Sequence, residues 1–173
     1  ALDGSDKTEL ILGREDVDID HLLQIGRQGR VVGGGYATER RTVEYFDPEL
    51  RKLSSALSKA FPGNPAVSII DASADEAKLL ILASSDTNPG TFYLYDKATR
   101  QVEELLSVRE ELVGQTLATM KPISVTAADG TRIPAYLTLP PGSSGKGLPA
   151  IVMPHGGPGA RDEWGFDWLA QFY

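Results

Sequence analysis

The sequence contains no cysteine among its 173 residues. Disulfide bonds, thiolate catalysis and cysteine-based zinc sites are therefore excluded, whereas the cellular compartment is left open. The sequence also lacks any apolar run close to the roughly 18 residues that span a membrane. Its first ten residues show neither the basic region nor the apolar region of a signal peptide. These absences predict a soluble protein, cytoplasmic or periplasmic, that makes no membrane contact.

Basic residues are fewer than acidic ones, 17 against 24, which gives a formal net charge of −7. No basic stripe exists that could neutralise phosphate groups, so nucleic-acid binding is not expected. The acidic run over residues 15–20 resembles the start of a calcium loop. Counted from Asp16, however, an EF-hand requires glycine and glutamate where His21 and Arg27 stand. The sequence therefore predicts no metal site, and nothing in it implies an organic cofactor.

The first two thirds of the chain read as short strands separated by turns. Residues 30–36 and 42–47 are rich in Val, Tyr and Phe, which favour a half-buried pleated surface, and we expect them to pair. The three glycines at 33–35 lack the G-x-G-x-x-G spacing of a phosphate-binding loop. A bulge or a close backbone approach within a sheet is the better interpretation.

A helix is predicted over residues 47–63. Asp47 can cap its first turn and Pro48 suits the first helical position, while Pro62-Gly63 ends it. Apolar side chains fall on one face at spacings of three and four residues, so the helix is expected to pack on a sheet. These side chains are Leu50, Leu53, Leu57 and Phe61.

Residues 66–107 contain four strand patterns with turn residues between them, which indicates a meander. About 42 residues with four strands match one blade of a β-propeller. Residues 31–47 could belong to another blade, although two blades cannot close a propeller of four to eight. We therefore expect residues 1–112 to be the C-terminal part of a β-propeller.

The pattern changes after Leu112. Asp129-Gly130 lies between two alternating segments and predicts a β-hairpin. Residues 148–154 (LPAIVMP) form a continuous apolar run, typical of a strand buried on both faces of a parallel sheet. A glycine-rich loop follows, and then a helix that could begin at Asp162 or Asp167, with Trp164 among its apolar positions. Strand, loop and helix in this order indicate the start of an α/β unit.

The glycine-rich loop has the residues expected of an oxyanion site. Gly156 and Gly157 lack Cβ atoms, so the backbone can turn sharply and present N–H groups to a substrate, and Pro158 stiffens the turn. In α/β-hydrolases one oxyanion N–H comes from this kind of strand-to-helix loop. His155 is assigned a structural or oxyanion-side role, because a general base in this fold follows the nucleophile.

At this point the sequence resembles a known family. LPAIVMPHGGPGARDEWGFD is similar to the start of the catalytic domain of prolyl oligopeptidase-type serine peptidases, in the acylaminoacyl-peptidase and dipeptidyl-peptidase branch. SSDTNPGTFYLYDKAT resembles the last propeller blades of that family, and ISVTAADGTRIPAYLTLPPG resembles its linking segment. The resemblance covers most of the chain from about residue 31 onward.

The resemblance implies a mainly β chain, in which a partial β-propeller (1–112) is followed by the first strands and first helix of an α/β-hydrolase domain (113–173). It also implies a Ser-His-Asp triad and an oligopeptide substrate. By the motif match, Gly157 carries the oxyanion N–H, His155 and Gly156 shape the loop, and Arg161 ties it down.

The triad itself is missing from the sequence. No G-x-S-x-G motif occurs, and the two histidines, His21 and His155, do not follow a nucleophile. We therefore expect the nucleophile to lie beyond Tyr173. The chain alone should be inactive, and the remainder of the same enzyme or another copy should complete the fold.

Three other interpretations are open. A proline iminopeptidase also uses the HGGPG motif, but about 150 strand-rich residues precede the motif here, which disfavours that enzyme. A non-catalytic propeller or a pseudoenzyme would lack the nucleophilic serine of the G-x-S-x-G motif in the sequence that follows. In a purely structural β-rich domain, the motif would be only a turn.

Overall fold

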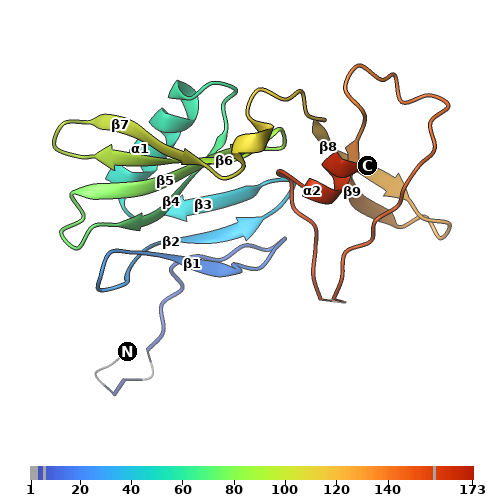
Figure 1. Ribbon diagram of the computed structural model, residues 1–173. Helices are drawn as coiled ribbons and strands as arrows, with labels where there is room; N and C mark the ends of the chain where they lie inside the picture. Colours follow the sequence, from blue (N-terminus) through green and yellow to red (C-terminus); the bar gives the residue numbers. More distant parts are fainter. Residues whose placement is uncertain (1–3, 6, 158) are drawn as a thin grey trace.

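The computed structural model describes residues 4–5, 7–157 and 159–173. Its strands form three antiparallel sheets of three, four and two strands, so the predicted mainly β character is confirmed. The three-stranded and four-stranded sheets lie against each other, and the two-stranded sheet lies to one side with the C-terminal helix (Figure 1). None of the helices among the described residues is long and apolar enough to cross a membrane.

The three-stranded sheet has its second strand in the middle. The predicted pairing of 30–36 with 42–47 is confirmed, with small differences at the strand ends. Leu23 pairs with Gly33 and the next residue pairs with Val31, so Val32 is the extra residue of a bulge, and its side chain is buried. The strands are β1 (His21–Ile25), β2 (Arg30–Ala37) and β3 (Arg41–Tyr45).

The glycines at 33–35 sit in the centre of β2, where neighbouring atoms leave no space for a side chain. A Cβ atom at Gly33 would lie 2.7 Å from the carbonyl oxygen of Glu44 on β3. At Gly35 it would lie 2.0 Å from Cε1 of His21, because the histidine ring covers this glycine. The predicted close backbone approach is therefore confirmed.

Helix α1 (Pro48–Ala60) forms as the sequence predicts. The Asp47 side chain accepts hydrogen bonds from the backbone N–H groups of Glu49 and Leu50, which satisfies two donors of the first turn. Leu50 and Leu57 are buried, and Leu53 and Phe61 pack against the same core. The Phe61 ring also stacks on Tyr93, with 4.6 Å between ring centroids.

The predicted meander over residues 66–107 is confirmed as a four-stranded antiparallel sheet in chain order. Two of its turns are closed by aspartate side chains that accept hydrogen bonds from backbone N–H groups, Asp75 from Ala77 and Asp96 from Ala98 and Thr99. The strands are β4 (Ala66–Ala72), β5 (Lys78–Ser85), β6 (Asn88–Asp96) and β7 (Gln101–Ser107).

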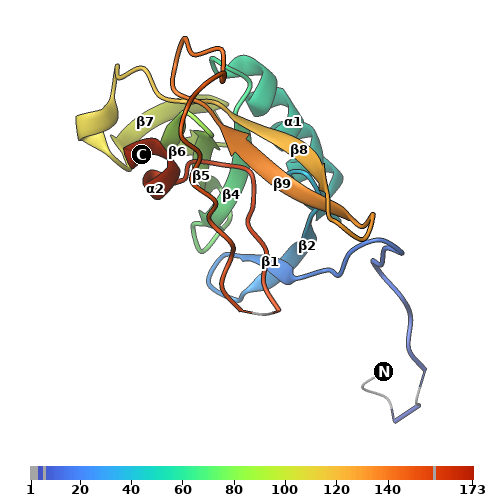
Figure 2. The same cartoon turned by 90° about the vertical axis from the view of Figure 1, so that its right-hand side faces the viewer.

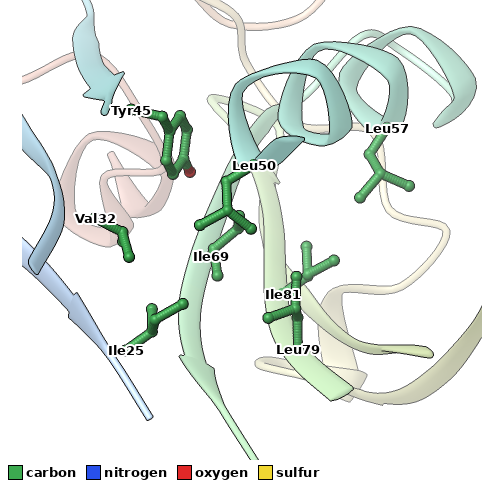
Figure 3. Close-up of a cluster of buried hydrophobic side chains, with 8 residues drawn as sticks. All are labelled: Ile25, Val32, Tyr45, Leu50, Leu57, Ile69, Leu79 and Ile81. Atoms are coloured by element: carbon green, nitrogen blue, oxygen red, sulfur yellow. The ribbon is translucent and has the colours of Figure 1, made fainter. Parts of the chain in front are cut away.

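The core lies between the two larger sheets and under α1 (Figure 3). Both sheets and the helix contribute side chains that point toward one another. At the rim, the Arg30 guanidinium donates to the Glu76 carboxylate, and the Gly26 N–H donates to Asp71 on the other sheet. The core side chains are Ile25, Val32, Tyr45, Leu50, Leu57, Ile69, Leu79 and Ile81.

The second part of the chain contains a short 3₁₀ helix, η1 (Glu110–Leu112), and a hairpin of β8 (Met120–Thr126) and β9 (Arg132–Thr138). The hairpin is closed by the predicted Asp129-Gly130 turn. The Gly130 N–H donates to the Ala127 carbonyl, and Gly130 has a φ of 90°, which glycine adopts without strain. Helix α2 (Trp168–Phe172) ends the described chain.

The predicted buried strand over residues 148–154 is wrong for this structure. The segment joins none of the sheets among the described residues, and Ile151 and Val152 are 60% and 88% exposed. A strand needs a hydrogen-bonding neighbour, and β8 and β9 pair only with each other. These apolar residues join no sheet here, so the expected α/β unit is not observed.

The core predicts a large effect for one leucine and a small effect for another in the same sheet. Leu79 is 0% exposed on β5, whereas Leu106 is 51% exposed on β7. We expect Leu79→Ala to lower the free energy of unfolding by about 2–5 kcal/mol, and Leu106→Ala to change it by only about 0.5 kcal/mol. Urea unfolding of both variants checks this, and equal losses would contradict the assigned core.

The Lys78–Asp96 pair predicts a pH-dependent contribution to stability. The Lys78 ammonium, 2.7 Å away, and the N–H groups of Thr99 and Ala98 lower the pKa of Asp96 to about 2. A lowered pKa stabilises the fold above the unfolded-state pKa of about 3.9, and this stabilisation is lost as the pH falls toward the folded value. In urea unfolding, Asp96→Asn should therefore be less stable than wild type at neutral pH, and the difference should shrink below about pH 4. A difference that stays constant with pH would contradict the charge interaction.

Candidate functional site

The glycine loop, defined here as residues 155–157, lies at the tip of a long excursion between β9 and α2. The two limbs of this excursion run side by side toward its tip (Figure 2). All three residues of the glycine loop are exposed. The limb before the tip is the apolar segment without a strand partner, and the limb after it contains residues 160–164, the anchor segment.

Gly157 adopts a backbone conformation that requires glycine. Its φ is 139°, and a Cβ atom would lie 2.9 Å from the backbone nitrogen of Gly159. Within the described part of the chain, no group accepts a hydrogen bond from the Gly157 N–H. The N–H is therefore available to an external acceptor. The predicted stiffening by Pro158 falls outside the described residues.

His155 contacts the loop backbone rather than another catalytic group. Its Nδ1 lies 2.9 Å from the carbonyl oxygen of Gly156. Because a carbonyl oxygen can only accept, a hydrogen bond here places the ring proton on Nδ1. A Cβ atom at position 156 would meet nothing within 4 Å, so there is room for a larger residue than glycine there. This geometry favours the loop-shaping role for His155.

Arg161, which the resemblance predicts to tie the loop down, fastens the anchor segment to the turn between β2 and β3. Its Nη1 donates to the Ala37 carbonyl at 2.7 Å, and its Nη2 donates to the Thr38 carbonyl. The Tyr136 hydroxyl on β9 donates to the next carbonyl, that of Glu39, at 2.8 Å. Three successive carbonyls of this turn are thus bonded by side chains that come from the second part of the chain.

A second set of contacts surrounds Arg41 at the start of β3. Its guanidinium donates through Nε to the Glu163 carboxylate at 2.7 Å, and through Nη1 and Nη2 to the Asp20 carboxylate at 2.7 and 2.8 Å. Nη2 also donates to the second oxygen of Glu163. Arg41 therefore bridges a carboxylate before β1 and a carboxylate in the anchor segment.

The charges of this network stabilise one another. Hydrogen bonds from Arg41 and then from His21 hold the pKa of Asp20 well below its usual range, and Glu163 and then Asp20 raise the pKa of Arg41. The His21 Nδ1 lies 2.8 Å from Asp20 Oδ1 and 3.1 Å from Arg41 Nη1. One ring nitrogen cannot donate to the first and accept from the second at the same time, so only one of these two contacts is a hydrogen bond.

Trp164 is a contact of the anchor segment and not a helical position. Its ring lies under the Arg40 guanidinium, 3.6 Å from the ring centroid, and its Nε1 donates to the Met120 carbonyl at 2.9 Å. Of the two predicted helix starts, Asp167 is correct, because it caps α2 through the N–H groups of Leu169 and Ala170. Asp162 starts no helix, and the predicted helical place of Trp164 is wrong.

Helix α2 is held to the sheets by Gln171. Its side-chain amide accepts from the Ala118 N–H and donates to the Ala118 carbonyl, as a neighbouring strand would. It also donates to the carbonyl of Asp86, whose carboxylate accepts from the Met120 N–H. The anchor segment is thus followed by a second attachment to the four-stranded sheet.

Sequence reasoning missed Arg41, Glu163 and Asp20. Arg41 and Glu163 are 122 positions apart, and each is one of many charged residues without a motif, so no local signal could have found the pair. Among the described residues, no three histidine, aspartate or glutamate side chains are placed to hold a metal ion. What the site offers chemically is an exposed backbone N–H on a loop whose following segment is tied down.

The comparisons with known proteins point to peptidases. No family model matches the chain. The chain is 28% identical to dipeptidyl aminopeptidase BIII of Pseudoxanthomonas mexicana over 177 residues, which covers 96% of this chain and 25% of that protein. It is 33% identical to dipeptidyl peptidase family member 6 of Caenorhabditis elegans over 122 residues, which covers 58% of this chain and 16% of that protein.

The chain thus spans a quarter or less of the length of these curated relatives. Both are dipeptidyl peptidases by name, and the longer match, over 96% of the chain, includes the strands of the two larger sheets as well as the glycine loop. The resemblance seen in the sequence is therefore borne out as a similarity to dipeptidyl peptidases.

Proposed function

We propose that this chain is part of a serine peptidase that cleaves oligopeptides by acyl transfer, with residues outside the chain supplying the nucleophile, base and acid. The observation that carries the proposal is the similarity to a dipeptidyl aminopeptidase over 96% of the chain. The names of both relatives favour the release of dipeptides. A proline iminopeptidase is disfavoured, because the match extends through the strands before the loop.

In this proposal the glycine loop stabilises the transition state. Attack on a peptide carbonyl places negative charge on its oxygen, and a preorganised N–H donor lowers the energy of that charge. The Gly157 N–H has no acceptor within the described part of the chain, and its unusual φ gives the N–H a direction that other residues would not supply. His155 holds the neighbouring carbonyl of Gly156. These three residues are the proposed oxyanion loop.

The two larger sheets support the propeller part of the proposal. A four-stranded antiparallel meander packs against a second antiparallel sheet, as neighbouring propeller blades do. We place the boundary between the propeller and the hydrolase part at residues 112 and 113, after η1. In this arrangement, the apolar segment 148–154 would find its neighbouring strands in the rest of the hydrolase domain.

The first experiment tests whether the complete product of the gene that encodes this chain is a serine hydrolase. After exposure to a fluorophosphonate probe, denaturing intact mass should show one covalent adduct, because the probe phosphonylates an activated serine. The 173-residue chain alone, of 18.6 kDa, should stay unlabelled. A folded complete product without any adduct would instead indicate a pseudoenzyme or an interaction module.

The second experiment tests the oxyanion role of Gly157. In the complete gene product, we expect Gly157→Ala to lower kcat by about 10²–10³, the loss typical of one oxyanion donor. The added Cβ would force the loop backbone to move, and with it the N–H. A chromogenic dipeptide substrate gives kcat and KM, and thermal unfolding gives the change in stability.

Gly165→Ala is the matched control. Gly165 is close in sequence, has no positive φ and has open space for a Cβ atom, so kcat should stay within about twofold of wild type. Equal kcat values for wild type and Gly157→Ala would show that the motif is only a turn.

A further inference from the structure

The anchor segment connects the proposed oxyanion loop to a part of the fold distant in sequence. Besides the stacking of Trp164 on Arg40, two hydrogen-bonded contacts attach it to this part of the fold. Arg161 donates to neutral carbonyls, whereas Glu163 accepts from the charged Arg41. Only the second contact joins two full charges, and Arg41 is oriented for it by Asp20 on its other side.

Removing Arg41 would do more than break one ion pair, because two carboxylates contact its guanidinium. Asp20 and Glu163 both lie within hydrogen-bonding distance of the same guanidinium, and all three side chains are 34–40% exposed. Without Arg41, the two carboxylates would face each other with no positive charge between them. Their repulsion would push the anchor segment away from the three-stranded sheet, so the contact would change from attractive to repulsive.

On the sheet side, both residues of this contact lie next to paired backbone. Asp20 donates its backbone N–H to the Gly35 carbonyl at 2.9 Å, and His21 lies over Gly35 on the central strand. Arg41 itself pairs with Ala37 at the end of the β2–β3 ladder. The carboxylate of Asp20 and the guanidinium of Arg41 are therefore set by the sheet, while Glu163 sits on a segment without secondary structure.

We infer that Arg41 is a positioning residue for the proposed oxyanion loop: through Glu163 it holds the anchor segment, and with it the direction of the Gly157 N–H. This inference rests on the proposed function. Arg41 touches no reacting atom in this scheme. Through Arg41 and Glu163, the three-stranded sheet sets the position of the catalytic donor. The sheet therefore contributes to catalysis, although it lies outside the proposed hydrolase domain.

The test measures fluorophosphonate labelling of the complete gene product, as the maximal labelling rate and the half-saturating probe concentration. Arg41→Ala should lower the maximal rate about tenfold, because a small displacement of a catalytic donor is costly. The half-saturating concentration should stay within about twofold, since probe binding does not use this contact. Arg41→Lys should fall between, because a lysine keeps the charge but cannot make paired bonds to both carboxylates.

A double variant separates positioning from ordinary structural support. If repulsion between Asp20 and Glu163 displaces the anchor segment, then Arg41→Ala with Glu163→Gln should label about threefold faster than Arg41→Ala alone. A residue that merely supports the sheet would show no such recovery. Arg27→Ala, which removes an exposed arginine from the β1–β2 turn, is the charge-matched control and should label like wild type.

Limited trypsin digestion of the same proteins identifies the affected segment. Arg41→Ala should speed cleavage after Arg161 about fivefold, the size expected for an exposed charge pair. Cleavage after Lys78 on β5 should be unchanged, which shows that the four-stranded sheet is intact. Normal labelling of Arg41→Ala overturns this inference and leaves the peptidase proposal standing. A wild-type protein that takes no label overturns the proposed function and this inference with it.

Discussion

Neither of the two larger sheets can bury its apolar face alone, and the cluster between them gives each sheet its second layer. Ile25, Val32 and Tyr45 come from one sheet, and Ile69, Leu79 and Ile81 come from the other, with α1 closing the side. The position of the β2–β3 turn follows from this packing. The contacts that Arg161 and Tyr136 make with this turn therefore depend on the packing between the two sheets.

The proposed oxyanion loop combines an exposed tip with a fastened base. The tip presents a backbone N–H, which must be accessible to a substrate, while residues 160–164 are bound by an arginine fork, an ion pair and a stacked tryptophan. Individually such exposed contacts contribute little to stability. In the proposed role, these contacts together restrict the orientation of the glycine loop. The orientation of an N–H donor determines how well it stabilises the negative charge of the transition state.

Local signals predicted the parts of this structure that local physics determines. Asp47 and Pro48 specify a helix start by satisfying its first N–H groups, and Asp129-Gly130 closes a hairpin because glycine accepts a positive φ. The structure of the apolar run at 148–154 could not be predicted from local signals. Its composition favours burial but does not identify the neighbouring strand that would bury it. The contact between Arg41 and Glu163 could not be predicted for a related reason. The two residues are 122 positions apart and meet only in the folded chain.

The glycines at the centre of β2 have one more consequence, which concerns register. A one-residue slip in a strand exchanges its two faces, and side chains normally oppose it. In β2 a slip would bring Val32 or Tyr36 into one of the three glycine positions, where neighbouring atoms leave no space for a side chain. The slip would take Val32 out of the core and the carbonyls of Ala37 and Thr38 away from Arg161, which lies more than 120 residues later. The glycines, the core and the anchor segment therefore all select the same pairing of β2, although they come from parts of the chain far apart in sequence.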